Sequence, residues 1–161
     1  SIIQAHNLCY STLVTPGSEC RLRDLRPGED YASFTLGDGA TYHFVKSHVH
    51  KSFLASLLES WLSKRKAIKR MLASCEDPRQ RTIFDKQQLA IKCTCNAVYG
   101  FTGVAHGLFP CLTIAETVTL QGRTMLERTK DFVESLSPRD LEALVPEGSS
   151  LGLAPEGSLR V

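Results

Sequence analysis

Two segments of the sequence carry polar side chains at spacings suited to binding an anion. Arg65 and Lys69 are four residues apart, so on a helix they share one face. Lys92 and Asn96 have the same spacing, and Tyr99 follows three residues later. Grouped cations repel one another unless a polyanion lies among them, and each charge-assisted hydrogen bond to that anion contributes about 1.5–3 kcal/mol. The spacing therefore indicates a site for a polyanion such as a triphosphate, if both segments are helical and adjacent.

The charges along the chain favour the same interpretation but do not require it. The formal net charge is only +2. Between Lys46 and Arg70, however, seven residues are basic and one, Glu59, is acidic. This imbalance gives a local positive field that attracts phosphates. Such a run is also typical of an ordinary solvated helix face, and the pattern alone leaves that alternative open.

Two other classes of protein are not favoured. No apolar run approaches the roughly 20 residues that a membrane-spanning helix needs. The six cysteines are interpreted as reduced thiols, because no secretion signal is visible. Cys93 and Cys95 are separated by one residue, whereas a zinc site uses at least two. No metal site is therefore expected in this chain.

Hydrophobic periodicity predicts the elements that position the two anion-binding segments. Residues 50–75 are expected to form a long helix, since apolar residues recur at three- and four-residue steps. A second helix is expected from Pro78 to about Val98, ended by Gly100 and Gly103. The short connection makes the two helices antiparallel neighbours. If their apolar faces pack together, their basic side chains converge beside the hairpin.

The other segments are predicted to form smaller elements around this helical hairpin. A β-hairpin is expected over residues 31–45, because apolar residues flank a glycine-rich turn. A third helix is expected over residues 112–134, and a short one over residues 137–144. The predicted buried stripe of the third helix is Ile114, Val118, Met125 and Phe132. Residues 145–158 are predicted to be a mobile loop, so the fold class is α+β and mainly helical.

Four stretches of the chain resemble ordered motifs of the family B DNA polymerases. Residues 86–103, KQQLAIKCTCNAVYGFTG, are similar to motif B, and residues 1–12, SIIQAHNLCYST, resemble the second half of motif A. The core positions of motif B fall here on Lys92, Asn96, Tyr99 and Gly100. Residues 61–72, WLSKRKAIKRML, resemble the first fingers helix, with the family's Arg and Lys at Arg65 and Lys69. Residues 107–127 resemble a palm helix, and the stretches are most similar to gammaherpesvirus polymerases.

The resemblance implies an antiparallel helical hairpin, the fingers, joined to an incomplete palm. It divides the chain into 1–49 (palm segment with the end of motif A, a loop and a β-hairpin), 50–100 (fingers hairpin with motif B), 101–144 (palm helices) and 145–161 (flexible loop leading into the motif C strand). The family's motif A aspartate would precede Ser1, and its paired motif C aspartates would follow Val161. We therefore expect an internal fragment that contains none of the catalytic or metal-binding residues.

The resemblance also implies a function, template-directed DNA synthesis in viral DNA replication. A deoxynucleotide would be transferred to a primer 3′-hydroxyl, with two Mg²⁺ ions in the full-length enzyme. The implied triphosphate ligands are Arg65, Lys69, Lys92 and Asn96, while Tyr99 and Gly100 would lie beside the nascent base pair. Expected partners are primer–template DNA, deoxynucleoside triphosphates and a viral processivity factor, with no membrane and a location in the host nucleus. The isolated chain is expected to be inactive.

The residues alone leave a second function open. A non-catalytic helical module would bind nucleic acid through the Lys64–Arg70 face, with a salt-dependent affinity and no nucleotide selectivity. Asn7 is interpreted as a structural polar residue. No role is assigned to the five histidines, because the sequence shows no acid–base partner for them.

Overall fold

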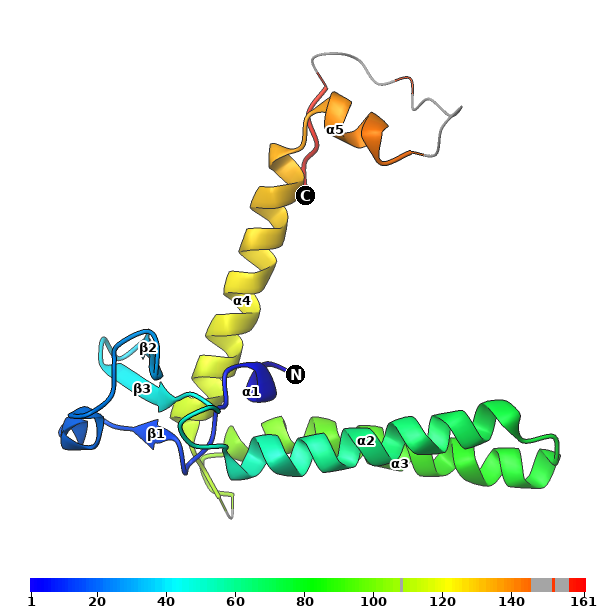
Figure 1. The fold of residues 1–161 in the computed structure, drawn as a ribbon, viewed down its shortest axis with the longest axis horizontal. Helices are drawn as coiled ribbons and strands as arrows, with labels where there is room; N and C mark the ends of the chain where they lie inside the picture. Colours follow the sequence, from blue (N-terminus) through cyan, green and yellow to red (C-terminus); the bar gives the residue numbers. More distant parts are fainter. Residues whose placement is uncertain (108, 146–151, 153–156) are drawn as a thin grey trace. The chain divides into compact units, whose positions relative to one another are not determined.

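The protein, seen in a computed structural model, is described over residues 1–107, 109–145, 152 and 157–161 (Figure 1). These residues form two compact units, Ser1–Leu120 and Gln121–Val161. The elements in chain order are α1 (Ile2–Ala5), β1 (Leu13–Val14), the 3₁₀ helix η1 (Glu19–Leu22), β2 (Tyr31–Thr35), β3 (Thr41–Val45), α2 (Phe53–Ser74), α3 (Pro78–Thr102), α4 (Leu112–Ser135) and α5 (Pro138–Ala143). The predicted α+β, mainly helical fold class is confirmed. Within the described ranges, no helix has the length and apolar character to cross a bilayer.

The predicted β-hairpin forms between β2 and β3, which pair in antiparallel register with Phe34 opposite Tyr42. In its turn, Leu36 N donates to Ala40 O at 3.1 Å, and Gly39 has a φ of +76°, a left-handed conformation that favours glycine. Strand β1 pairs with the other edge of β3, so the strand order is β1-β3-β2. The sequence did not predict β1, because a two-residue strand has no periodicity to recognise.

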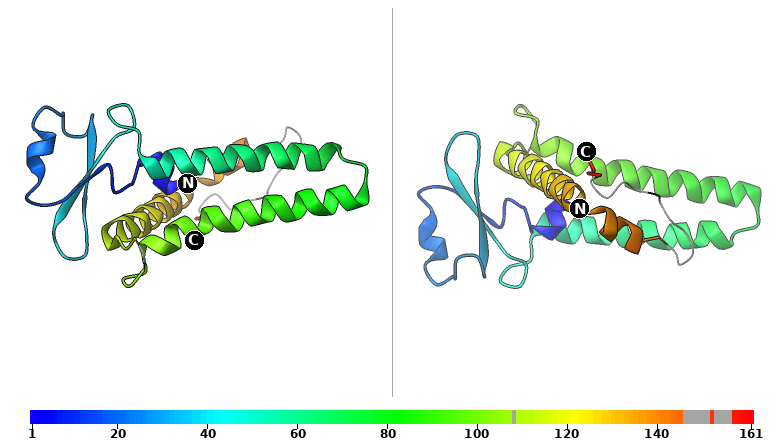
Figure 2. Two further views of the ribbon diagram at one scale, coloured as in Figure 1. Left: turned by 90° about the horizontal axis from the view of Figure 1, so that it is seen from below. Right: turned by 90° about the horizontal axis from the view of Figure 1, so that it is seen from above.

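Helices α2 and α3 form the predicted antiparallel hairpin and run side by side (Figure 2). Ser52 begins α2, because its Oγ accepts a hydrogen bond from Ala55 N at 3.0 Å. Asp77 begins α3 in the same way, accepting from Arg79 N at 3.0 Å, and Pro78 occupies the first turn. Each cap satisfies a backbone donor that would otherwise have no partner within the helix. Local sequence therefore sets where both helices begin.

The end of α3 differs from the prediction. The helix continues to Thr102, four residues past Val98, and Gly103 is its C-cap residue. Gly100 was expected to end the helix and instead lies inside it, so that expectation was wrong. The exposed fractions of Val98 and Thr102 are 2% and 0%. We attribute the longer helix to the burial of these two side chains, which outweighs the roughly 1 kcal/mol that a glycine costs inside a helix.

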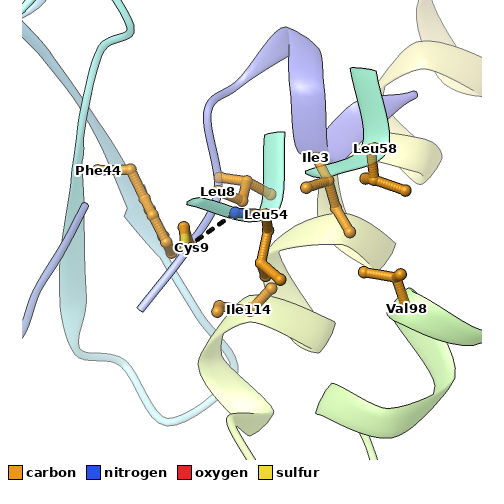
Figure 3. Packing of buried hydrophobic residues seen from close by; sticks show 8 residues of the cluster. All are labelled: Ile3, Leu8, Cys9, Phe44, Leu54, Leu58, Val98 and Ile114. Atoms are coloured by element: carbon orange, nitrogen blue, oxygen red, sulfur yellow. Dashed lines mark hydrogen bonds between the residues drawn. The ribbon is translucent and has the colours of Figure 1, made fainter. Parts of the chain in front are cut away.

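One apolar core holds the base of the hairpin against α1, the sheet and the start of α4 (Figure 3). Its buried members are Ile3, Leu8, Cys9, Phe44, Leu54, Leu58, Val98 and Ile114. A polar contact lies within it, because Leu54 N donates to Cys9 Sγ at 3.5 Å. Burying a large aliphatic or aromatic side chain contributes about 1.5–3 kcal/mol. The core therefore anchors the first turns of α2, and the hairpin extends away from it.

The second unit contains the later part of α4 and all of α5. As predicted, Ser137 caps α5, and its N–H donates to Asp140 Oδ2 at 2.9 Å. The expected buried stripe on α4 holds for Ile114 and Val118 in the first unit but is wrong for Met125 and Phe132, which are 55% and 65% exposed. No described residue from Gln121 onward is buried, so the described part of this unit has no apolar core that Met125 and Phe132 could join. Most of the predicted loop at 145–158 lies outside the described residues.

Candidate functional site

Arg65 is held between the two helices of the hairpin. Its Nε donates to Oε1 of Gln88 on α3 at 3.2 Å, and the Gln88 amide nitrogen donates to Asp85 Oδ1 at 3.0 Å. The Arg65 side chain is half-buried. A side chain that is already ordered loses less conformational entropy when a ligand binds. These two hydrogen bonds therefore order the guanidinium before any ligand binds.

A surface groove along α2 gathers four basic side chains. We call it the cationic groove; it encloses about 350 Å³ and is lined by Leu62, Arg65, Lys66, Lys69, Arg70 and Ala73. Its lining contains no carboxylate. Within the described part of the chain, Lys66, Lys69 and Arg70 take part in no ion pair. The groove thus brings the predicted residues Arg65 and Lys69 together in an uncompensated positive field.

On α3, the exposed residues Lys92 and Asn96 follow Gln88 at intervals of four residues. Each interval is a rise of about 6 Å and slightly more than one turn. The three side chains therefore form one stripe on the side of α3 that Arg65 contacts. Asn96 also borders a second hollow, of about 290 Å³, which we call the Ser1 hollow. Its lining is Ser1, Ile2, Ile3, Leu58, Cys95, Asn96 and Val118.

The predicted triphosphate ligands thus fall into two neighbouring groups. Arg65 and Lys69 lie in the cationic groove, whose lining includes neither Lys92 nor Asn96. Lys92 lies one turn of α3 from the residue that Arg65 contacts, and Asn96 lies one turn further, at the Ser1 hollow. Binding of one triphosphate by all four side chains stays a prediction.

The two residues predicted to lie beside a nascent base pair are adjacent in α3. The side chain of Tyr99 lies outside what the structure describes. Gly100 is exposed, and a Cβ built on it would meet no atom within 4 Å. Open space therefore lies beside the backbone at Gly100, where a ligand has room to approach closely. The role of both residues stays a prediction.

A buried amide fastens the start of α2 to the segment that follows α1. Asn7 is 2% exposed and has a φ of +53°. Its Nδ2 donates to Val45 O at 2.8 Å and to His50 O at 2.7 Å, and its Oδ1 accepts from Ser52 N at 3.0 Å. The interpretation of Asn7 as a structural residue fits this geometry. The sequence could not predict the partners, because they lie 38 to 45 residues away.

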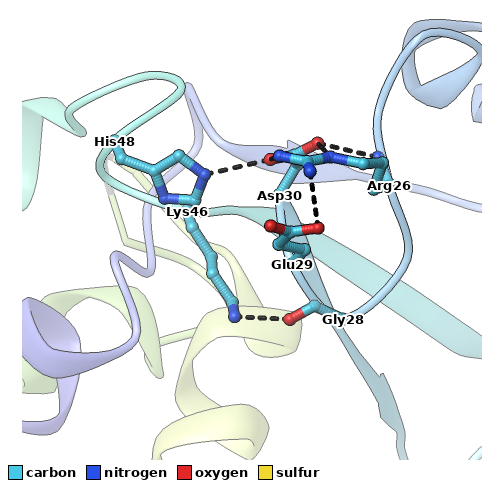
Figure 4. Close-up of polar contacts among 6 residues, drawn as sticks. All are labelled: Arg26, Gly28, Glu29, Asp30, Lys46 and His48. Carbon is cyan, nitrogen blue, oxygen red and sulfur yellow. Dashed lines mark hydrogen bonds and ion pairs between the residues drawn. The ribbon is translucent and has the colours of Figure 1, made fainter.

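A second polar cluster, centred on Asp30, ties the loop before β2 to the segment after β3 (Figure 4). Asp30 accepts from Arg26 Nε at 3.1 Å and from His48 Nε2 at 3.0 Å. Arg26 also pairs with Glu29 at 2.7 Å, and Lys46 Nζ donates to Gly28 O at 2.5 Å. Hydrogen bonds from Arg26, followed by the one from His48, hold the pKa of Asp30 far below its ordinary value. The sequence had assigned no role to His48, whose partner is an aspartate 18 residues away.

No metal centre is found among the described residues, since none of their His, Cys, Asp and Glu side chains form a group of three or more that could hold an ion. All six cysteines are free thiols. Cys111 is half-buried, and this burial raises the pKa of its thiol.

Comparison with known proteins identifies the class to which this chain belongs. The family model for DNA polymerase family B matches residues 1–153. The chain therefore belongs to the family B DNA polymerases. A solved family B DNA polymerase from the hyperthermophilic archaeon Pyrobaculum calidifontis has the same fold, with a TM-score of 0.63 over 84% of this chain and 16% of that one, at 20% identity.

Herpesvirus proteins are among the relatives of this chain. The chain is 76% identical to the DNA polymerase catalytic subunit of Epstein-Barr virus (strain B95-8) over 162 residues, which cover 100% of this chain and 16% of that protein. It is 62% identical to the DNA polymerase catalytic subunit of human herpesvirus 8 type P over 145 residues, 90% of this chain and 14% of that protein. The predicted likeness to gammaherpesvirus polymerases is confirmed. The chain spans about one sixth of the length of these relatives.

Proposed function

We propose that this chain belongs to a larger polymerase that carries out template-directed DNA synthesis in viral DNA replication. In this proposal, α2 and α3 bind the triphosphate of the incoming deoxynucleotide. Family membership supports the class of reaction. The observation that carries the assignment to these helices is the cationic groove, where Arg65 and Lys69 lie together without a carboxylate.

The reaction would be a displacement at the α-phosphate of the nucleotide. The primer 3′-hydroxyl attacks this phosphorus, the bond to the bridging oxygen breaks, and pyrophosphate leaves. Negative charge grows on the leaving pyrophosphate, so fixed cations stabilise the transition state more than the ground state. Arg65, Lys69 and Lys92 would supply these cations. They act by position and charge and form no covalent bond with the substrate.

The other predicted site residues would position the nucleotide. Asn96 lies on the same stripe of α3 as Lys92 and borders the Ser1 hollow, so its amide would support the nucleotide next to the triphosphate. Tyr99 and Gly100 would lie beside the nascent base pair. The open space at Gly100 agrees with such an approach.

The complete polymerase is proposed to use two Mg²⁺ ions, which would activate the attacking hydroxyl and stabilise the leaving oxygens. The described residues of this chain offer no group of ligands that fits such an ion. No step assigned to this chain therefore runs through a metal. Primer–template DNA, a viral processivity factor and a location in the host nucleus belong to the same proposal.

We further propose that the hairpin closes over a correctly paired nucleotide and brings its cations onto the phosphates. The distribution of contacts favours this motion. The buried Asn7 amide and the apolar core hold the start of α2, whereas the cationic groove lies further along the helix. A hairpin anchored at one end can turn about that end without disrupting the core.

Single-turnover incorporation by the complete polymerase tests the proposal. Lys92→Ala should lower the rate of incorporation by about 10²–10³, the usual effect of losing one preorganised transition-state contact. Lys64→Ala is the matched control, because Lys64 is exposed on the same hairpin but lies outside the cationic groove. An incorporation rate for Lys92→Ala equal to that of the control would remove Lys92 from the mechanism.

The same assay separates the polymerase from a non-catalytic nucleic-acid-binding module. Such a module would bind DNA through the Lys64–Arg70 face, would lose affinity with salt, and would not distinguish nucleotides. If the complete protein binds primer–template DNA but incorporates no deoxynucleotide, the binding module is the correct function.

A further inference from the structure

The cationic groove holds more positive charge than the proposed triphosphate contacts use. Lys66 and Arg70 line it together with Arg65 and Lys69. Both are exposed, and neither takes part in an ion pair within the described ranges. They are four residues apart and both positive, a pairing that destabilises a helix unless an anion compensates for it. Folding therefore does not require these two charges in the groove.

The four cations of the groove form two pairs that differ in direction. Successive residues of an α-helix are turned by about 100° around its axis. Arg65 contacts Gln88 on α3, so Lys66, one residue later, is turned away from α3. Arg70 bears the same relation to Lys69. The groove therefore has an inner pair beside α3, Arg65 and Lys69, and an outer pair, Lys66 and Arg70.

We propose that the outer pair binds the sugar–phosphate backbone of the unpaired template strand ahead of the incoming nucleotide. This inference rests on the proposed function. In template-directed synthesis the unpaired template leads directly to the base that pairs with the incoming nucleotide. Its phosphates therefore run up to the base pair that the incoming nucleotide forms. A second pair of cations along the outer edge of the same groove is placed to meet them.

The residues that line the groove indicate which part of the template strand it would bind. Leu62 and Ala73 are its uncharged members, and no aromatic side chain lines it. Sites that hold the bases of single-stranded DNA use aromatic rings on which the bases stack. Without such rings, the groove would bind phosphates by charge alone and would show no preference for sequence.

Template overhangs of different length test this assignment in the complete polymerase. The probes are two primer–templates with the same duplex, one with a single unpaired template nucleotide and one with a long unpaired segment. The outer-pair variant is Lys66→Gln with Arg70→Gln. Its matched control is Lys64→Gln with Arg79→Gln, which removes the same charges from exposed positions of the hairpin outside the groove.

The outer-pair variant should lose about tenfold in affinity for the long overhang, and its salt slope should fall by roughly 0.7 for each lost phosphate contact. Affinity for the short overhang should match the control, and the deoxynucleotide concentration that half-saturates single-turnover incorporation should be unchanged. Equal losses on both overhangs, or no loss on either, would overturn the inference. A loss of nucleotide affinity would instead assign the outer pair to the triphosphate and overturn it as well.

The closing control separates this inference from the proposed function. Arg65→Gln with Lys69→Gln should weaken nucleotide affinity and leave the dependence on overhang length intact. If that variant keeps normal nucleotide affinity, the triphosphate site on this hairpin is wrong. The effect of overhang length on the Lys66 and Arg70 variant is measured separately, so it does not depend on the outcome for the Arg65 and Lys69 variant.

Discussion

Polar groups have opposite environments at the base and in the middle of the α2–α3 hairpin. At the base, the Asn7 side chain is 2% exposed, and both ends of its amide are hydrogen-bonded to the backbone. In the middle, the cationic groove gathers four basic side chains with no carboxylate among its lining residues. At the base, the buried amide is hydrogen-bonded within the protein. In the groove, the cations have no carboxylate partner among the lining residues and are available to a ligand.

This difference separates residues that stabilise the fold from residues available to a ligand. A buried polar group without a partner costs about 1–3 kcal/mol, so selection for stability alone pairs every buried group. An exposed cation carries no such penalty and adds little to stability. We therefore expect substitutions at the base to change the free energy of unfolding, and substitutions in the middle to change nucleotide binding.

Leu54 and Leu62 give the largest expected contrast in stability. Leu54 is 3% exposed in the core at the base, whereas Leu62 is half-exposed in the cationic groove. Leu54→Ala should lower the free energy of unfolding by about 2–5 kcal/mol, because it leaves a cavity, and Leu62→Ala should lower it much less. Urea unfolding of the chain, followed by the fluorescence of its one tryptophan, Trp61, measures both. Equal losses would mean that the core does not anchor α2.

Asn7 and Asn96 apply the comparison to one residue type. Asn7→Ala should lower the free energy of unfolding by about 2–3 kcal/mol, because two carbonyls and the Ser52 N–H lose their buried partner. Asn96→Ala, at an exposed position, should change it by less than about 0.5 kcal/mol. In the complete polymerase, Asn96→Ala should weaken nucleotide binding. A stable Asn7→Ala protein would contradict the proposed role of the amide as an anchor.

Lys69 and Lys64 sharpen the comparison within α2 itself. Lys69→Ala in the complete polymerase should weaken the apparent affinity for the deoxynucleotide about tenfold, since it removes one charge-assisted contact of about 1.5 kcal/mol. Lys64→Ala should leave it unchanged. Neither substitution should alter the urea midpoint of the chain measurably, because both side chains are exposed. Indistinguishable nucleotide titrations for the two variants would remove Lys69 from the site.

The smallest effect is expected from Asp30. Its carboxylate lies outside the hairpin but, like the Asn7 amide, is hydrogen-bonded within the protein. Its folded-state pKa is lowered from 3.8, so the stability it contributes is fully present above that value and is lost as the pH falls below it. Asp30→Asn should therefore flatten the acid side of the stability profile below about pH 4. Urea midpoints of the chain at several acidic pH values measure this. Identical acid profiles for the two proteins would show that the cluster does not couple folding to protonation.

Periodicity and caps predicted the long elements well. The stripe from Leu54 to Leu72 predicted α2, and Pro78 gave the start of α3. The end of α3 was missed, because the preference of Gly100 for a helix end gave way to the burial of Thr102. At such positions, tertiary packing outweighs the local preference of the sequence.

The candidate site was predicted as residues but not as contacts. Spacing paired Arg65 with Lys69 and Lys92 with Asn96, and the family resemblance gave these four residues the role of triphosphate ligands. The hydrogen bond from Arg65 to Gln88 depends on the register between α2 and α3, which no local pattern encodes. The same holds for Asn7, whose three amide partners come from a segment far along the chain.

Protection of lysines by nucleotide tests the central claim most directly. The complete polymerase is bound to a primer–template whose primer lacks a 3′-hydroxyl, so that no reaction follows, and its amines are labelled with and without the matching deoxynucleotide. Mass spectrometry then compares Lys69 and Lys92 with the exposed Lys64 of the same helical hairpin. The nucleotide should protect Lys69 and Lys92 and leave Lys64 unchanged. Equal labelling of all three, with and without nucleotide, would contradict the assignment of the triphosphate to this hairpin.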